Sequence, residues 1–218
     1  MGGGVYLLSR ALWGGLGALI SLFLFCLDPN LIAHSSLVTT DSGFAFFVLL
    51  YLAAMIWAFQ NDDIWRWLAC GAALGLAAAS KYSAGALVPV TGFILLVRAW
   101  GDLSAQIPPN SRSLWAPIKS GRLVFRVFGW ILLRFAAISL LAGLVLWSCY
   151  GFQWNPYPLA PFVEGLRYLS THMAGGHPTF LNGEHSNSGY WYYFPEVFLL
   201  KTPLPALACM GIALAITL

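Results

Sequence analysis

An apolar stretch near the start of the chain, FAFFVLLYLAAMIWAF at residues 44–59, decides the fold. A run of about 18 to 20 apolar residues is long enough to cross a bilayer as a helix, and several comparable runs occur in this chain. Of its 218 residues, 59% are hydrophobic and only 9% are charged, whereas soluble globular proteins carry about 25% charged residues. The sequence therefore predicts an all-α, polytopic transmembrane helical bundle.

Five spans can be placed on the sequence, and a sixth begins close to its end. We expect them at residues 11–27, 43–60, 67–80, 84–98 and 129–150, with the sixth starting near residue 203. Before the first span, MGGGVYLLSR has the composition of the tail of a preceding helix, and the chain ends inside an apolar run. Both features predict a fragment of a larger membrane protein, so that residues 1–218 form a partial transmembrane domain.

The basic residues predict the orientation of these spans, because cytoplasmic loops of membrane proteins carry an excess of Lys and Arg. Three basic residues, Lys81, Arg167 and Lys201, lie on one side of the spans. The other side holds eight, which are Arg10, Arg66, Arg98, Arg112, Lys119, Arg122, Arg126 and Arg134. We therefore expect residues 99–128 to form a cytoplasmic linker and residues 151–202 an extracytoplasmic loop segment. All four histidines and five of the eight acids fall on the outer side.

Several classes of function are disfavoured by the sequence. The net charge of +3 is not gathered into a basic patch interleaved with aromatics, so nucleic acid is not an expected partner. The sequence contains no P-loop, Rossmann glycine pattern, HExxH or GxSxG motif. The four cysteines lie in or beside apolar runs without CxxC spacing, which is typical of small core or lipid-facing residues.

Asp41 and His34 are the first candidate site residues, in HSSLVTTDSGF at residues 34–44. Thr40 or Asp41 could simply cap a helix that starts near Gly43, where the helix dipole favours a carboxylate. Alternatively, the carboxylate lines an outward-facing polar cavity and binds a metal, a cation or a sugar hydroxyl. If residues 34–41 are helical, His34 lies two turns before Asp41 on the same face.

Lys81 and Tyr82 form a second candidate, in ASKYS between two short spans. The lysine could snorkel to the headgroups or hold an anionic phosphate at the outer interface, and Tyr82 fits either role. Arg167 and Lys201 are the remaining basic side chains of the outer side. Lys201 could be an interfacial anchor or a second phosphate ligand.

A third group lies in GHPTFLNGEHSNSGYWYYFPEVFLLKTPLP at residues 176–205. His177, Glu184 and His185 could form a metal site or an acid–base pair, or belong to a solvated loop. Their spacing matches no standard zinc pattern, so a divalent metal is only a possible cofactor. The aromatic run WYYF at residues 191–194 is typical of an interfacial belt.

Three motifs in this order resemble the GT-C membrane glycosyltransferases, in particular glycosyltransferase family 39, with its protein O-mannosyltransferases and aminoarabinose transferases of lipid A. They are PNLIAHSSLVTTD before an apolar helix, GLAAASKYSAGALVP, and the 176–205 segment. The resemblance implies a multi-helix enzyme of the bacterial inner membrane with an extracytoplasmic active site. It implies sugar transfer from a polyprenyl-phosphate donor to a glycan, lipid or protein acceptor.

The resemblance also implies roles for single residues. Asp41 matches an acid at the start of a later helix, and Lys81 matches a basic position near the lipid-phosphate cavity. Transfer from a lipid phosphate needs a base for the acceptor and cations for the departing phosphate. The family's first helix and the acidic loop after it, which carries its presumed general base, are expected before Met1. A secondary transporter and a non-catalytic membrane scaffold remain as alternatives, although a transporter would show polar residues at broken helices and an internal repeat.

Overall fold

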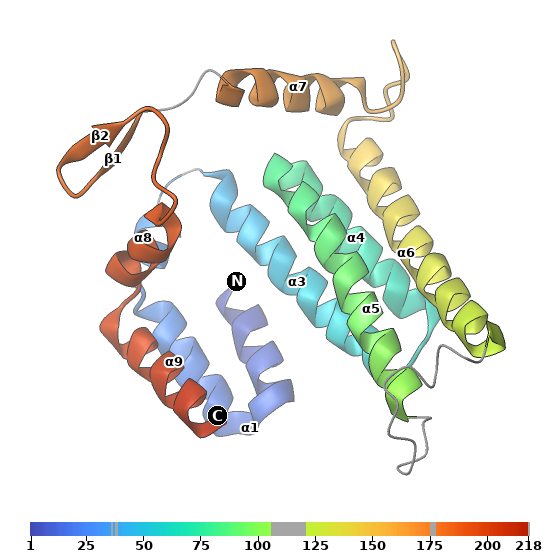
Figure 1. Ribbon diagram of the computed structural model, residues 1–218, viewed down its shortest axis with the longest axis horizontal. Coiled ribbons are helices and arrows are strands. Elements are labelled where there is room, and N and C mark those ends of the chain that lie inside the picture. The colour runs from blue at the N-terminus through green and yellow to red at the C-terminus, as the bar shows by residue number, and fades with distance from the viewer. Residues whose placement is uncertain (36, 38, 106–120, 175–177, 218) are drawn as a thin grey trace. The chain divides into compact units, whose positions relative to one another are not determined.

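The computed structural model describes residues 1–35, 37, 39–105, 121–174 and 178–217 (Figure 1). The protein is 81% helical, which confirms the all-α class. In chain order the elements are α1 (Gly2–Cys26), α2 (Pro29–Ser35), α3 (Thr40–Gln60), α4 (Ile64–Ser80), the 3-10 helix η1 (Tyr82–Ala86), α5 (Leu87–Ala105), α6 (Gly121–Cys149), α7 (Ala160–Ala174), β1 (Thr179–Leu181), β2 (Glu184–Ser186), α8 (Tyr193–Lys201) and α9 (Leu204–Thr217).

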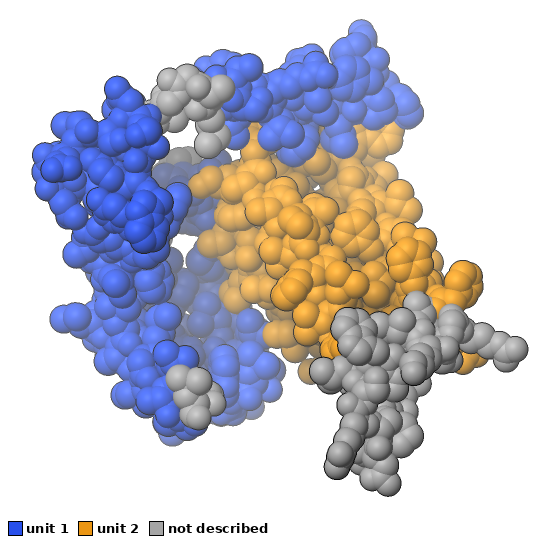
Figure 2. Space-filling model, viewed as in Figure 1, with its two compact units in different colours: residues 1–42, 153–218 blue, residues 43–152 orange. Residues whose placement is uncertain are grey.

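The chain forms two compact units (Figure 2). Unit 1, blue in Figure 2, comprises residues 1–42 and 153–218, and unit 2, orange, comprises residues 43–152. Unit 2 contains the helices α4, α5 and α6 together with most of α3. Unit 1 contains α1, α2 and everything from α7 onwards.

By length and hydropathy alone, four described helical segments match a membrane span, or five if α8 and α9 count as one bent span, although the first of the four is broken at Gly14. These segments are Gly2–Cys26, Thr40–Gln60, Tyr82–Asp102 and Phe125–Cys149. Helix α4 is apolar but has only 17 residues, and α8 and α9 meet at an angle of 112°. The prediction of a polytopic helical membrane protein is therefore confirmed.

Helices α5 and α6 extend into the stretch that the sequence analysis assigned to a linker, residues 99–128. Helix α5 continues to Ala105 and α6 begins at Gly121. Residues 106–120 lie outside the described part of the chain.

The core of unit 2 is built from large side chains on four helices. Tyr51, Trp67, Leu95 and Ile138, which come from α3, α4, α5 and α6, are each fully buried. The Tyr51 hydroxyl lies 2.6 Å from the hydroxyl of the buried Thr91, which also donates to the Leu87 carbonyl in its own helix. These contacts satisfy both hydroxyls away from water, which stabilises the packing of α3 against α5.

Two glycines let α4 approach α6 closely (Figure 1). A Cβ atom on Gly71 would lie 2.8 Å from the Ile138 carbonyl oxygen, and one on Gly75 would lie 2.7 Å from the Ala142 carbonyl oxygen. Small residues four apart on one helix face allow helix backbones to approach in this way, as in small-xxx-small packing. The α4–α6 contact therefore depends on the absence of side chains at Gly71 and Gly75.

Helix α1 folds back on itself at Gly14, which has φ 76° and ψ −171°. A Cβ atom on Gly2 would lie 3.3 Å from Leu22 Cδ1 and 3.4 Å from Phe25 Cε1, whereas a straight helix would hold residues twenty apart at about 30 Å. The arms, residues 2–13 and 15–26, are each about 18 Å long. The predicted span 11–27 therefore does not form one straight helix, and neither arm alone matches a hydrocarbon core of about 30 Å.

The rest of unit 1 contains short elements set by local turn chemistry. Asp28 accepts hydrogen bonds from the Asn30 and Leu31 amides at 2.8 and 3.1 Å, which makes it the N-cap of α2. Strands β1 and β2 pair antiparallel, and the turn residues Asn182 and Gly183 between them have φ of 52° and 88°. Two positive-φ residues of the Asn-Gly type are the signature of a type I′ hairpin.

Candidate functional site

Lys81 occupies the break between α4 and η1. It has φ −158° and ψ 135°, and this extended conformation ends α4 while its amide still donates to the Ala77 carbonyl at 3.1 Å. The Ala84 amide donates to the Lys81 carbonyl at 3.1 Å, which closes the first turn of η1. The backbone therefore fixes the position of Lys81, and its side chain is exposed at this end of unit 2.

Tyr82 and Tyr150 meet beside this break. Tyr150 directly follows α6, and its hydroxyl is hydrogen-bonded to that of Tyr82. Tyr82 was a candidate from the sequence, but Tyr150 was not, and a tyrosine at a span end is in itself ordinary in an aromatic belt. The structure thus places one ammonium group and two phenols at the same end of unit 2. Because one phenol donates its only O–H to the other, the ammonium and one hydroxyl remain able to donate hydrogen bonds to an anion.

Asp41 lies in the first turn of α3, which begins at Thr40 rather than near Gly43. The carboxylate is exposed and close to the positive end of the helix dipole. Within unit 2, a Cβ atom on Gly43 would lie 3.9 Å from Ser80 Oγ, so α3 begins beside the end of α4. The buried hydroxyl of Thr39, just before α3, has no hydrogen-bond partner among the described residues.

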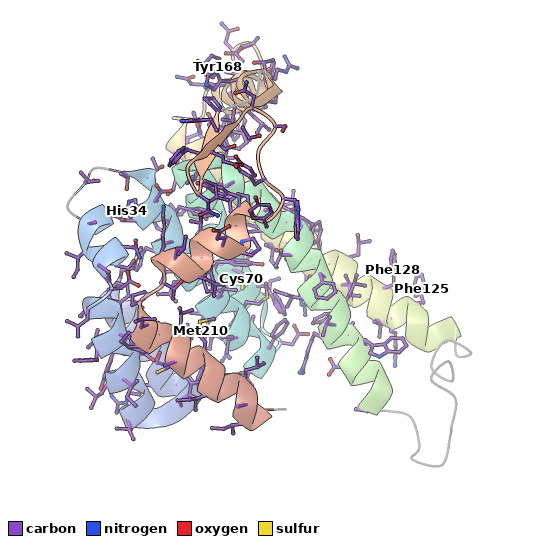
Figure 3. The ribbon with its side chains drawn as sticks, turned by 60° about the vertical axis from the view of Figure 1, so that its left-hand side comes forward. His34, Cys70, Phe125, Phe128, Tyr168 and Met210 are labelled. Carbon is purple, nitrogen blue, oxygen red and sulfur yellow. The ribbon has the colours of Figure 1, made fainter. Side chains whose placement is uncertain are left out.

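His34 is not on one continuous helix with Asp41. Helix α2 ends at Ser35 and α3 begins at Thr40, so the condition for placing both side chains on one helix face is not met. The Ser42 hydroxyl instead approaches the His34 carbonyl at 3.5 Å, a long contact that brings the two helix ends together within unit 1. The exposed His34 is labelled on α2 in Figure 3.

The remaining outer candidates lie in unit 1 on separate elements. Glu184 and His185 are exposed on β2, and the His185 ring lies 4.8 Å from that of Phe180 on β1. Asn182 donates to Glu196 at 2.6 Å, which ties the hairpin to the first turn of α8. No group of three His, Cys, Asp or Glu side chains in the described part of the chain could hold a metal, and His177 lies outside that part.

The two basic candidates of unit 1 also lie on different helices. The exposed Lys201 ends α8, and its carbonyl accepts a hydrogen bond from the Asn30 side chain of α2 at 2.6 Å. Arg167 is exposed on α7, where its carbonyl accepts from the hydroxyls of Ser170 and Thr171. These hydrogen bonds connect Lys201 to α2, whereas those of Arg167 lie within its own helix.

Asp62, at the opposite end of α4 from Lys81, forms a second polar centre, which the sequence did not single out. Arg134 donates to both of its oxygens, from Nε at 2.9 Å and from Nη2 at 2.8 Å. The indoles of Trp67 and Trp130 donate at 2.6 and 2.7 Å. Hydrogen bonds from Arg134, opposed by partial burial, together with those from the two indoles, lower the pKa of Asp62 from 3.8 to about 2.

Residues 1–108 match the family model described as dolichyl-phosphate-mannose-protein mannosyltransferase. The match covers α1 to α5, including Asp41, Lys81 and Asp62, and confirms over these residues the resemblance to a GT-C membrane glycosyltransferase. No curated protein and no solved structure matches the chain.

Proposed function

We propose, on the premise that residues 1–108 are those of a GT-C membrane glycosyltransferase, that this protein transfers a sugar from a polyprenyl-phosphate donor to an acceptor on the extracytoplasmic side of a membrane. The observation that carries the proposal is the family match across α1 to α5. The polar groups at the Lys81 end of unit 2 support it, because they have the chemistry that a lipid-linked phosphate requires. The donor arrives already activated, which is consistent with the absence of a nucleotide-binding motif.

The phosphate of the donor is assigned to Lys81, with Tyr82 as its neighbour. The departing polyprenyl phosphate carries increasing negative charge as the sugar–phosphate bond breaks, and an ammonium group fixed by a rigid backbone stabilises that charge. The hydrogen-bonded pair of Tyr82 and Tyr150 adds one neutral hydroxyl donor. The break between α4 and η1 supports this assignment, because it holds Lys81 at the helix end instead of within an apolar span.

We assign Asp41 to the acceptor side of the reaction, where its carboxylate accepts or orients the proton of the acceptor group. General-base assistance contributes about 10² to 10⁴ in rate where a carboxylate reaches the acceptor hydroxyl. His34 remains a candidate catalytic residue with Asp41, and the candidate substrate-binding residues also include Arg167, Glu184, His185 and Lys201. Location of Asp41 in the first turn of α3 is also compatible with simple capping, so the activity test must separate the two roles.

The test is transfer of labelled mannose from a polyprenyl-phosphate donor to a peptide acceptor, by protein expressed from its complete gene. Lys81→Ala should reduce kcat/KM by about 10², with partial recovery in Lys81→Arg. Asp41→Asn should reduce kcat by at least about 10², while a pure cap would tolerate asparagine. Asp28→Asn, at the N-cap of α2, is the matched control for the acid, and the exposed Arg126→Gln is the control for the lost positive charge.

Unchanged transfer in both Asp41→Asn and Lys81→Ala would contradict the site assignment. Absence of transfer with every donor of a panel of polyprenyl-phosphate sugars, in protein that is folded and membrane-inserted, would instead favour the non-catalytic scaffold. The panel also identifies the sugar, since mannose is only the substrate named by the matched family.

A further inference from the structure

A small pocket lies at the Asp62 end of unit 2, at the opposite end of α4 from Lys81. Its volume is about 100 Å³, several times what one water molecule needs. Aromatic rings of Phe59, Trp67 and Trp130 form part of its wall, and its polar groups are Asp62, Arg98 and Asp102. The pocket therefore combines apolar walls with a few charged groups, as binding sites for small polar ligands do.

Asp62 belongs to the frame of this pocket. A carboxylate has about four lone-pair sites, and Asp62 accepts four hydrogen bonds, two from Arg134 and one each from the indoles of Trp67 and Trp130. Its charge is balanced by Arg134, which lies within 6.0 Å of both indole rings. These bonds fix the two indoles that line the pocket and leave Asp62 little capacity for a ligand.

The Arg98–Asp102 pair differs from this network in both length and exposure. Arg98 Nε lies 3.4 Å from Asp102 Oδ2, and the side chains are 47% and 50% exposed. Charge-assisted hydrogen bonds are usually about 2.7 to 2.9 Å long, so this ion pair is loose. Surface pairs of this kind contribute little to stability. A ligand that carries both a positive and a negative charge can therefore replace the contact between Arg98 and Asp102 at low cost.

We propose that this pocket binds the headgroup of a zwitterionic membrane phospholipid, one that carries a phosphate and a primary ammonium. The phosphate would lie against the Arg98 guanidinium, and the ammonium against the Asp102 carboxylate. Charge supports this choice, because the two lining acids, Asp62 and Asp102, are balanced by Arg98 in the lining and by Arg134, which pairs with Asp62 from outside it. An anionic lipid would meet the Asp102 carboxylate, and a simple cation would meet the Arg98 guanidinium.

The surroundings of the pocket have the character of a membrane interface. On α6, Phe125 and Phe128 precede Trp130 by five and two residues and are 78% and 63% exposed. Both are labelled on this helix in Figure 3. Trp65, beside Asp62, is 71% exposed, and Arg66 stacks on the exposed Trp57 at 4.5 Å. Aromatic and basic side chains gather at headgroup level, so a lipid headgroup is the ligand most abundant at this depth.

The test is native mass spectrometry of the purified chain in detergent with added phosphatidylethanolamine or phosphatidylglycerol. Wild type should bind phosphatidylethanolamine on the order of tenfold more tightly than phosphatidylglycerol, because one charge-assisted contact to the ammonium is worth about that factor. Arg98→Ala should weaken both lipids by a similar factor, and Asp102→Asn should remove the preference between them. Arg126→Ala, an exposed arginine of α6 outside the pocket, is the matched control.

Equal binding of the two lipids by wild type would overturn the proposal, as would wild-type binding in both Arg98→Ala and Asp102→Asn. Binding of soluble phosphoethanolamine as tightly as the lipid would overturn the assignment to a membrane lipid. If Arg98→Ala does not fold, the half-exposed Asp102→Asn, which keeps the size of the side chain, decides the outcome. These measurements do not involve sugar transfer, so they stand or fall independently of the proposed activity.

Discussion

Unit 2 buries large side chains from four helices, whereas unit 1 buries almost none. Tyr51, Trp67, Leu95 and Ile138 are all inaccessible in unit 2. Among the described residues, those buried in unit 1 are Ser9, Ala18, Ala160 and Leu181. Apolar side chains of unit 1 such as Trp13, Leu204 and Ile216 are 70% to 79% exposed.

This difference shows that the two units are specified in different ways. Unit 2 depends on complementary packing, with glycines where helix backbones meet and an ion pair at one end of α4. Unit 1 depends on local backbone signals: a positive-φ glycine, an N-cap and an Asn-Gly turn. Unit 2 should therefore respond most to added volume, and unit 1 most to changes in backbone preference.

The largest effect is expected where α4 meets α6. The double variant Gly71→Ala/Gly75→Ala should lower the free energy of unfolding by about 3 to 5 kcal/mol, because each overpacking costs about 1 to 3 kcal/mol and the facing atoms are backbone carbonyls that cannot move aside. Titration with SDS from mild detergent would measure it. Gly143→Ala on α6, where a Cβ atom meets nothing within 4 Å, is the control and should be neutral or slightly stabilising.

A second effect is expected at Gly14 in unit 1. Its φ and ψ lie in a region that is essentially restricted to glycine, so Gly14→Ala should cost about 1 to 3 kcal/mol although a Cβ atom there has open space. Hydrogen exchange should increase over residues 2–26 and not in α4 or α6. The neighbouring Gly15→Ala, also with open space but helical, should protect the same segment; equal loss in both variants would contradict the fold-back.

A third effect tests the ion pair of unit 2. The pKa of Asp62 is lowered from 3.8 to about 2, which corresponds to about 2 kcal/mol, reduced to about 1 to 2 because the side chain is 45% exposed. This contribution is present above about pH 4 and is lost as the pH falls towards 2. Asp62→Asn should remove this stabilisation at pH 7, so that the melting temperature changes less between about pH 4 and pH 2. Asp63→Asn is the control, because asparagine should preserve the N-cap of α4.

The smallest effect is expected at the N-cap of α2. Asp28→Ala should cost about 1 kcal/mol by leaving the Asn30 and Leu31 amides without their acceptor, and Asp28→Asn should cost less because asparagine also caps. The hydrogen-exchange rates of residues 29–35, measured with rising temperature, would show the difference. A change in the α4–α6 exchange rates would contradict the separation of the two units.

Some elements were predicted correctly from the sequence, and others were missed although the sequence carries a signal for them. The apolar run at residues 44–59 lies in α3 as expected. Helix α9 starts at Leu204, close to the residue 203 expected for the sixth span, but its 14 residues make a span only together with α8. The hairpin in the 176–205 segment was missed, although Asn182-Gly183 between Leu181 and Glu184 is a strong local signal for a type I′ turn. The fold-back at Gly14 carries no comparable signal, because Gly14 and Gly15 lie in an apolar run that reads as a continuous helix.

The candidate site was also predicted only in part. The sequence identified Lys81 and Tyr82, and the structure added Tyr150 as their neighbour. Asp62 looked like an ordinary loop acid because its partner Arg134 lies 72 residues later in the chain. No local pattern records a contact of that separation.

The sequence by itself determined that this is a helical membrane protein, because hydropathy is a property of each segment and few charges interrupt the apolar runs. Only the tertiary structure decided which polar groups meet: Asp62 with Arg134, Tyr82 with Tyr150, and Asn30 with Lys201. Helices of similar composition can pack in many registers. The choice among them depends on backbone approach at Gly71 and Gly75 and on hydrogen bonds between distant residues, which become defined only when the chain is folded.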